Sequence, residues 1–461
     1  MGISSLGVGS GILTQSVLDQ LRKADDAKQI RPITLNLANE NDKKNSLQVI
    51  DASMTNFRDS INALKSATVF NGRSATVTGT SVEVTASSNS DIQDFTINVN
   101  HLATKQIEQS GAFTASTDLV ASGMVGTGTM TLNVGTGTPV SISYDGTTTL
   151  KGLKNLINKN AGNQVDATLL QVSPTESRLV ISAVGTGASN NISITDNSAG
   201  LDTKLTTGLT TLQAGLDNQF TFNGQTITRA DNTITDLVSG YTINLKEAGS
   251  SNVSVAQDRT SIETKVDSFV AKYNSIVTEL GKQTLSSTNS TTRGIFSGES
   301  SVKNMKSSIE NMIAIASGGG GNMQDYGFTV ARDGTMSIDK TVFNAKLDAN
   351  ATNVKAFFTG GNFTKANNSV VTLTGVFNDF YNIANSYTKV NGGLDQLSNS
   401  ISATITSLQD RQTSATNRLD AKYAIMKKKY TAYNTLINKF NSASSIFTQL
   451  SSSTTTSSRG Y

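Results

Sequence analysis

The residues best placed to do chemistry are three glycines near the N-terminus, in the segment GVGSGILTQSVLDQL. Glycines at alternate positions before a helix are typical of loops that hold phosphate groups, because their backbone N–H groups can approach the phosphate closely. Such a loop needs a preceding strand, and only six residues precede Gly7. The spacing Gly7, Gly9 and Gly11 also lacks the later glycine of a dinucleotide fingerprint, and no Gly-Lys-Ser/Thr follows. We interpret this segment as a flexible leader before an amphipathic helix.

The other candidate chemical groups lack partners at a usable spacing. The chain has no cysteine, which excludes disulfides, thiol catalysis and cysteine-bound metal. Its one histidine, His101, follows the alternating apolar residues of 95–99, so we expect it at the end of a strand, in a structural or surface role. Asp196 and Asp202 have neither the spacing nor the glycine of a calcium loop. The sequence therefore predicts a structural protein without catalytic residues, metal or cofactor, and not an enzyme.

A basic and aromatic segment near the C-terminus is the one candidate for nucleic-acid binding. Lys427, Lys428 and Lys429 lie close to Tyr423 and Tyr430, a mixture that is common in single-stranded nucleic-acid sites. The tyrosines, however, fall on the apolar stripe of a helix and the lysines mainly on its flanks, which indicates a solvated helix face. The net charge of +3 is small, and no apolar run approaches the ~20 residues of a membrane span. We expect neither a nucleic-acid nor a membrane partner.

The elements that must position any site are helical at both ends of the chain. Three stretches space their apolar residues alternately three and four apart, as in a helix that packs along one stripe. They are Leu47, Ile50, Met54, Phe57, Ile61 and Leu64; Ile262, Val266, Phe269, Tyr273, Ile276 and Leu280; and Leu419, Tyr423, Met426, Tyr430, Tyr433, Ile437, Phe440 and Phe447. Single amphipathic helices are marginal alone, so we expect the N-terminal helix to pack on helices of the C-terminal half, with the middle of the chain as an insertion.

The terminal helices carry the residues that we expect to make contacts in an assembly. Thr14 is the expected N-cap of a first helix, and Ile30, Ile33 and Leu37 keep the phase of the stripe that follows. We predict that these three pair with Tyr430, Ile437, Phe440 and Phe447, within a subunit and between neighbours. The candidate contact residues are Leu18, Leu21, Ile30, Ile33, Leu37, Tyr430, Tyr433, Ile437, Phe440 and Phe447.

The middle of the chain is predicted to be β-rich. Alternating apolar residues over 129–144 indicate a hairpin, and Leu150, Leu153 and Ile157 indicate a short helix after it. Three more strands, at residues 165–169, 179–183 and 192–194, complete a β-β-α-β-β-β module. A second sheet domain is expected from residues 82–99 and 220–255, with a hairpin turn at Asn223-Gly224. A small third hairpin is expected to turn at Asp333-Gly334.

Several of these segments resemble bacterial flagellar filament cap proteins. Residues 3–11, ISSLGVGSG, with 18–21, LDQL, resemble the N-terminus of that family, and residues 95–106, FTINVNHLATKQ, are similar to its N-terminal sheet motif. Residues 153–196 are similar to the insertion module that the family shares with flagellins. Residues 220–245 resemble its second sheet signature, which residues 269–274, FVAKYN, close. The Ser/Thr-rich residues 451–461 are not explained by the resemblance.

The resemblance implies a structural cap at the distal end of the flagellar filament. It implies a ring, commonly pentameric in the family, with a plate of sheet domains and legs of paired terminal helices, which promotes folding of arriving flagellin and prevents its loss. The implied partners are further copies of the chain, flagellin, the hook–filament junction protein and a cytoplasmic export chaperone. The resemblance assigns the candidate contact residues of the terminal helices to oligomerisation and to contact with the filament. The implied location is extracellular, after export through the flagellar type III apparatus, and the lack of cysteine and of a signal peptide agrees with that route.

Pattern and resemblance together predict an α+β multidomain chain, with a leg of coiled-coil or bundled terminal helices and two β-rich head domains inserted between the N- and C-terminal halves. The expected domains are a leg (1–45 and 420–461), a helical bundle with a small hairpin (46–71 and 259–419), a β-rich head (72–115 and 211–258) and an outer head (116–210). The alternatives are a flagellin-like or hook–filament junction protein, which shares helical termini, and a surface adhesin whose head domains serve cell adhesion.

Overall fold

The computed structural model of the protein describes residue 11, residues 14–314 and residues 319–456. These residues form two compact units. The helical body contains the residues up to 67 and from 263 onward, and the sheet unit contains residues 68–262. The β-rich part is therefore an insertion between the N- and C-terminal halves, as the sequence predicted. Most of the glycine-rich leader and the end of the Ser/Thr-rich tail lie outside the described residues.

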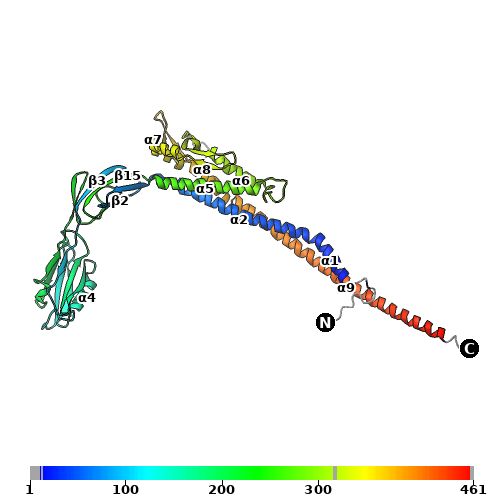
Figure 1. Ribbon diagram of the computed structural model, residues 1–461, viewed down its shortest axis with the longest axis horizontal. Helices are drawn as coiled ribbons and strands as arrows, with labels where there is room; N and C mark the ends of the chain where they lie inside the picture. The colour runs from blue at the N-terminus through cyan, green and yellow to red at the C-terminus, as the bar shows by residue number, and fades with distance from the viewer. Residues whose placement is uncertain (1–10, 12–13, 315–318, 457–461) are drawn as a thin grey trace. The chain divides into compact units, whose positions relative to one another are not determined.

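Long helices make up the helical body (Figure 1). They are α1 (Gln15–Gln29), α2 (Arg31–Lys65), α5 (Arg259–Thr284, whose first residues belong to the sheet unit), α6 (Ser300–Asn311), α7 (Lys340–Thr359), α8 (Val376–Thr388) and α9 (Gly393–Thr456), with the short 3-10 helices η2 (Met312–Ala314) and η3 (Met323–Tyr326). Helix α2 packs against α8 and α9, and α1 packs against α9. Thr14 caps α1 as expected, because its hydroxyl accepts a hydrogen bond from the backbone N–H of Val17.

The two predicted apolar stripes of α2 and α5 form the core of the helical body. Every residue of both stripes is buried, from Leu47 to Leu64 on α2 and from Ile262 to Leu280 on α5. Phe269 of α5 is enclosed by other rings: its centroid lies 5.8 Å from that of Phe57, 5.3 Å from Phe377 and 6.2 Å from Phe380. The prediction of these stripes from spacing alone is confirmed.

The helical body also contains two β-hairpins. Strands β16 (Phe328–Val330) and β17 (Met336–Ile338) flank the turn predicted at Asp333-Gly334. Strands β18 (Gly361–Thr364) and β19 (Val370–Leu373) form a second hairpin that the sequence did not predict. Most of their residues are exposed, so they lack the apolar alternation by which strands are recognised.

The sheet unit contains four antiparallel sheets. Two are built around one core, in the strand orders β1 (Arg73–Thr78), β15 (Gly249–Gln257), β3 (Gln93–His101), β11 (Asn218–Phe222), β12 (Gln225–Arg229), and β13 (Thr233–Ile234), β14 (Tyr241–Leu245), β2 (Val82–Ala86). The other two, with α4 (Leu150–Ala161), surround a second core, in the orders β6 (Val140–Asp145), β5 (Thr127–Val134), β9 (Ile192–Asp196), and β10 (Thr210–Gln213), β4 (Ile107–Gln109), β8 (Glu176–Ala183), β7 (Val165–Ser173). The short helices α3 (Ala67–Phe70) and η1 (Thr203–Leu205) complete the chain.

The predicted hairpin at Asn223-Gly224 and the predicted β-β-α-β-β-β module are both present. Asn223 and Gly224 have φ values of 49° and 85°, the left-handed conformations that a two-residue hairpin turn requires. The module runs β5, β6, α4, β7, β8, β9, and Leu150, Leu153 and Ile157 of α4 are buried as predicted. The module is nevertheless split between two sheets, and β4 and β10, which the sequence did not predict, complete the second of these.

We expect residues 72–258, expressed alone, to fold and to melt cooperatively. Both cores of the sheet unit consist of residues from 82 to 255, so the fragment retains every buried apolar contact within them. The measurement is thermal unfolding followed by circular dichroism, with Phe220→Ala as a matched variant that removes a fully buried ring and lowers the melting temperature. If the wild-type fragment shows no cooperative unfolding transition, and its melting curve equals that of the Phe220→Ala variant, the insertion depends on the helical body for its fold.

Candidate assembly surface

Helix α9 runs antiparallel to α1 and to the start of α2, and polar side chains set the register of the pair. Along α9, Gln412 donates to Thr34 (3.0 Å), Arg418 to Gln29 (2.7 Å) and Lys422 to Asp25 (2.6 Å). Residue numbers rise on one helix while they fall on the other. The first turns of α1, with Gln15 and Leu18, consequently share a groove with Tyr423, Ala424 and Lys427 of α9.

Tyr423 is the centre of a polar cluster between α1 and α9. Its hydroxyl donates to Asp25 Oδ2 (2.9 Å), which also accepts from Lys422 Nζ, and Arg22 lies over its ring at 5.7 Å from the centroid. Arg22 also donates to Asp420 (2.5 Å). The hydrogen bonds from Lys422 and Tyr423 lower the pKa of the Asp25 carboxyl, and burial together with Asp25 raises the pKa of the Tyr423 phenol. Oppositely charged side chains thus hold α1 and α9 together.

This register corrects one prediction. We expected Ile30, Ile33 and Leu37 to pair within the subunit with Tyr430, Ile437, Phe440 and Phe447. Instead, Ile33 lies beside Ala415 and Arg418, which precede Tyr430 on α9 by about three to four helical turns. The apolar spacing correctly indicated which side of each helix faces the other, but it carries no information about the axial offset between them.

The C-terminal tail of α9, residues 430–450, continues as a single helix beyond the start of α1 (Figure 1). Several of its apolar side chains are exposed: Tyr433 is 56%, Phe440 67% and Phe447 73% exposed. Tyr430 and Ile437 on the same stripe are half-buried. Residues 421–456 contain five lysines and no acidic residue. The tail is therefore an amphipathic helix whose apolar side is open to solvent at Tyr433, Phe440 and Phe447, and four of the five lysines lie just before it.

The remaining candidate contact residues lie on α1 and α2 and at the joint between them. Leu18 is buried against α9, whereas Leu21 is 41% exposed. Ile30 lies between the two helices, and Ile33 and Leu37 follow on α2; all three are half-buried. Sequence reasoning missed Ile425, Leu436 and Ile446, which are also exposed on α9. They fall outside the three-and-four spacing, so only their apolar character could have indicated them.

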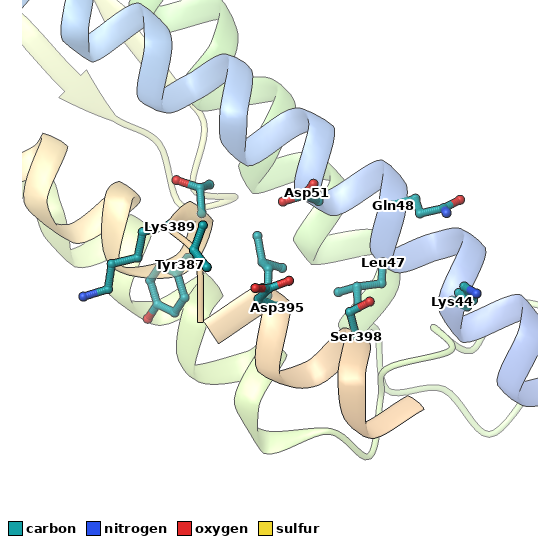
Figure 2. Close-up of a pocket in the computed structure, with 11 residues that line it drawn as sticks. Lys44, Leu47, Gln48, Asp51, Tyr387, Lys389, Asp395 and Ser398 are labelled. Carbon is teal, nitrogen blue, oxygen red and sulfur yellow. The ribbon is translucent and has the colours of Figure 1, made fainter. Parts of the chain in front are cut away.

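A pocket of about 240 Å³ opens between α2 and the connection from α8 to α9 (Figure 2). Leu47 and Leu394 are buried at its base, and charged groups, including Lys44, Asp51 and Lys389, lie around it. Asp395 accepts a hydrogen bond from the backbone N–H of Asn391, which orders the connection. No nucleophile with an adjacent base lines this pocket, so its lining does not support catalysis. The pocket is large enough to accommodate a side chain.

The chemical candidates of the sequence occupy structural or surface positions. His101 is exposed at the end of β3, and Lys427, Lys428 and Lys429 are exposed on α9. Asp196 accepts hydrogen bonds from the Tyr144 hydroxyl (2.5 Å) and from the backbone of Ser198 and Leu201, and burial with this bond raises the pKa of Tyr144 to about 12. Asp196 thus stabilises the loop that follows it, residues 197–201.

The described part of the chain contains neither a candidate metal site nor a candidate membrane span. No three histidine or acidic side chains there come together as a metal site would require. None of its helices combines the length and the apolar character needed to cross a membrane.

Two family models match the chain. The model described as flagellar hook-associated protein 2 N-terminus matches residues 10–106, and the one described as flagellar hook-associated protein 2 C-terminus matches residues 215–442. Together they cover more than two thirds of the chain.

Individual relatives agree with these matches. The flagellar hook-associated protein 2 of Escherichia coli K12 is 26% identical over 469 residues, which cover 97% of both chains. That of Campylobacter jejuni is 28% identical over 420 residues, 79% of this chain but only 65% of the relative. The crystal structure of the Escherichia coli flagellar cap protein FliD, domains D1-D2-D3, has a TM-score of 0.62 at 22% identity and covers 77% of this chain and 99% of that one. The fold is therefore shared.

Proposed function

The chain belongs to the flagellar hook-associated protein 2 family, and we propose that it forms the cap at the distal end of a bacterial flagellar filament. The structural observation that carries the proposal is the tail of α9, residues 430–450. An amphipathic helix with its apolar side exposed is marginal alone and gains stability when that side is covered. A ring of copies seated on a filament end supplies such a cover.

The proposed action is mechanical. Copies of the chain form a ring whose sheet units make a plate and whose terminal helices make legs on the filament end. Flagellin that arrives through the filament channel folds beneath the plate and joins the filament instead of diffusing away. The exposed stripe of the tail is the surface that we assign to neighbouring copies and flagellin, through Tyr430, Tyr433, Ile437, Phe440 and Phe447.

The finer partners and the location follow from the same family membership. We infer a small closed ring, pentameric as is common in the family, with the hook–filament junction protein as a partner before filament growth and a cytoplasmic chaperone as a partner before export. The site of action is the extracellular filament tip, reached through the flagellar type III apparatus. A chain without cysteine suits passage in an unfolded state, because no disulfide can form on the way.

The four-domain division remains our proposal within the two observed units. Helices α2 and α9 pass through the proposed boundaries at residues 45–46 and 419–420 without a break, so the leg and the bundle would share both helices. In the sheet unit, one core lies entirely within the proposed β-rich head, whereas the second core includes Phe113 and its sheet includes β4 and β10, which extend beyond the proposed outer head of residues 116–210. The flagellin-like, junction and adhesin alternatives are not favoured, because the cited relatives carry the name of the second hook-associated protein.

The test is deletion of the gene in the parent bacterium. We expect cells without filaments, or with very short ones, and flagellin monomers in the medium, with both restored by the wild-type gene. The measurements are filament counts by electron microscopy and flagellin in the cell-free medium by immunoblot. Normal filaments in the deletion strain would contradict the proposal.

We expect His101→Gln to leave motility unchanged. His101 is exposed at the end of β3, opposite Gln219 in the sheet, so glutamine fits the same position without a catalytic or metal-binding loss. The measurement is swimming diameter in soft agar, with secreted protein quantified to confirm export. Lost motility with normal export and folding would reveal a site that this account lacks.

A further inference from the structure

We propose that α1 is a detachable arm, held on α9 by an ionic latch that salt opens. The latch consists of Arg22 and Asp25 on α1 and Asp420, Lys422 and Tyr423 on α9. The inference deepens the proposed function, on which it depends for its biological use, because it says how the contact surface of the leg is regulated. The latch itself is a property of the single chain.

The contacts between α1 and α9 are polar and reciprocal. An α1 carboxylate, Asp25, meets an α9 ammonium, Lys422, at 2.6 Å, and an α1 guanidinium, Arg22, meets an α9 carboxylate, Asp420, at 2.5 Å. Both α9 partners are at least half exposed, which leaves these pairs open to counterions. Attraction between exposed charges is weak and falls as salt shortens the screening length.

The apolar part of the α1 contact is small. Leu18 is the one buried side chain of α1, and Leu21 is 41% exposed. Helix α2, by contrast, buries six apolar side chains from Leu47 to Leu64 against its neighbours. Because hydrophobic burial is not screened by salt, α2 stays in place under conditions that weaken the hold on α1.

The joint between α1 and α2 allows one helix to leave without the other. Helix α1 ends at Gln29 and α2 begins at Arg31, with Ile30 between them. Pro32 lies in the first turn of α2 and has no backbone N–H, so the ladder of helical hydrogen bonds lacks one bond there, and the backbone bonds from Ile30 to Asp26 and from Thr34 to Ile30 remain. The arm can therefore swing at this joint while α2 remains folded.

Opening the latch would lengthen the contact surface of α9. Tyr423 belongs to the same three-and-four spaced stripe as Tyr430, Tyr433 and Ile437, and α1 covers part of it in the closed state. Release of α1 joins Tyr423 to the open stripe, which then extends by about two helical turns. A neighbouring copy would find a longer surface on the opened chain.

The test is hydrogen exchange of the full-length monomer, measured by mass spectrometry at about 0.05 M and about 1 M NaCl. We expect exchange of residues 15–29 to accelerate about three- to tenfold at high salt, while residues 47–64 change less than about twofold. Asp25→Lys is expected to accelerate exchange of α1 at low salt, and the double variant Asp25→Lys with Lys422→Asp to restore protection. Lys428→Asp, the same charge reversal at an exposed position of α9 outside the latch, is the matched control and leaves α1 protected.

Two results would overturn the latch: exchange of α1 that does not depend on salt, or a double variant that exchanges as fast as Asp25→Lys alone. The salt series uses the wild-type chain, so it decides the matter even where a variant misfolds. Failure here is separable from failure of the cap function, which filament counts measure. A chain that supports filaments but shows salt-independent exchange would lack the latch and still be the cap.

Discussion

Replacing Phe269 with alanine is expected to lower the free energy of unfolding of the helical body by about 3–5 kcal/mol. Phe269 is fully buried, and its ring lies within 6.3 Å of the rings of Phe57, Phe328, Phe377 and Phe380. Its removal leaves a cavity among rings that come from three other elements, α2, β16 and α8, which cannot all move inward to fill it. The measurement is urea unfolding of the full chain, followed by the helical signal in circular dichroism.

Phe440→Ala is the matched control, since it removes the same ring from an exposed position of the same chain. We expect it to change the free energy of unfolding by no more than about 0.5 kcal/mol. Similar losses in the two variants would mean that the helical body does not depend on the packing of its aromatic core.

The second large effect is expected for Phe440→Asp, which should abolish the ring while leaving the monomer stable. Phe440 is 67% exposed in the single chain, so a charge there remains in contact with solvent. In the proposed ring the same position is covered, and burial of a phenylalanine side chain is worth about 1.5–3 kcal/mol in each copy. A carboxylate without a partner would lose that gain and add a desolvation penalty.

The measurements are native mass spectrometry of the purified variant and, in cells, flagellin in the medium. We expect monomers in place of rings, together with leaked flagellin. Ser442→Asp is the matched control: two residues along a helix is a rotation of about 200°, so the same charge then lies on the opposite side of α9. If rings persist in Phe440→Asp, or are lost equally in Ser442→Asp, the apolar side of residues 430–450 is not part of the contact surface.

The parts of the fold that could be predicted are those that depend on the spacing and type of residues close together in the sequence. The stripes of α2 and α5 follow from apolar residues three and four apart, and the hairpin at Asn223-Gly224 follows from the two residues that adopt left-handed conformations most readily. The pairing of β1 with β15, or of β4 with β10, joins residues more than a hundred positions apart. No local pattern encodes such a pairing, so the order of the strands within the sheets could not be predicted.

At the candidate site, too, local spacing predicts some features and not others. The identity of the contact helices and their apolar sides followed from the heptad-like spacing of residues such as Tyr430 and Ile437. Their axial offset depends on which charges meet, and Asp25 with Lys422 sets it in the structure. Either helix alone offers several acceptable charge pairs, and the break at Ile30 adds a joint that apolar spacing does not reveal.

Electron cryo-microscopy of the purified full-length protein tests the central claim most directly. We expect closed rings of a few copies, in which the α9 tail of each copy lies against a neighbour with Phe440 and Phe447 covered. Open filaments, or rings in which residues 430–450 stay uncovered, would contradict it.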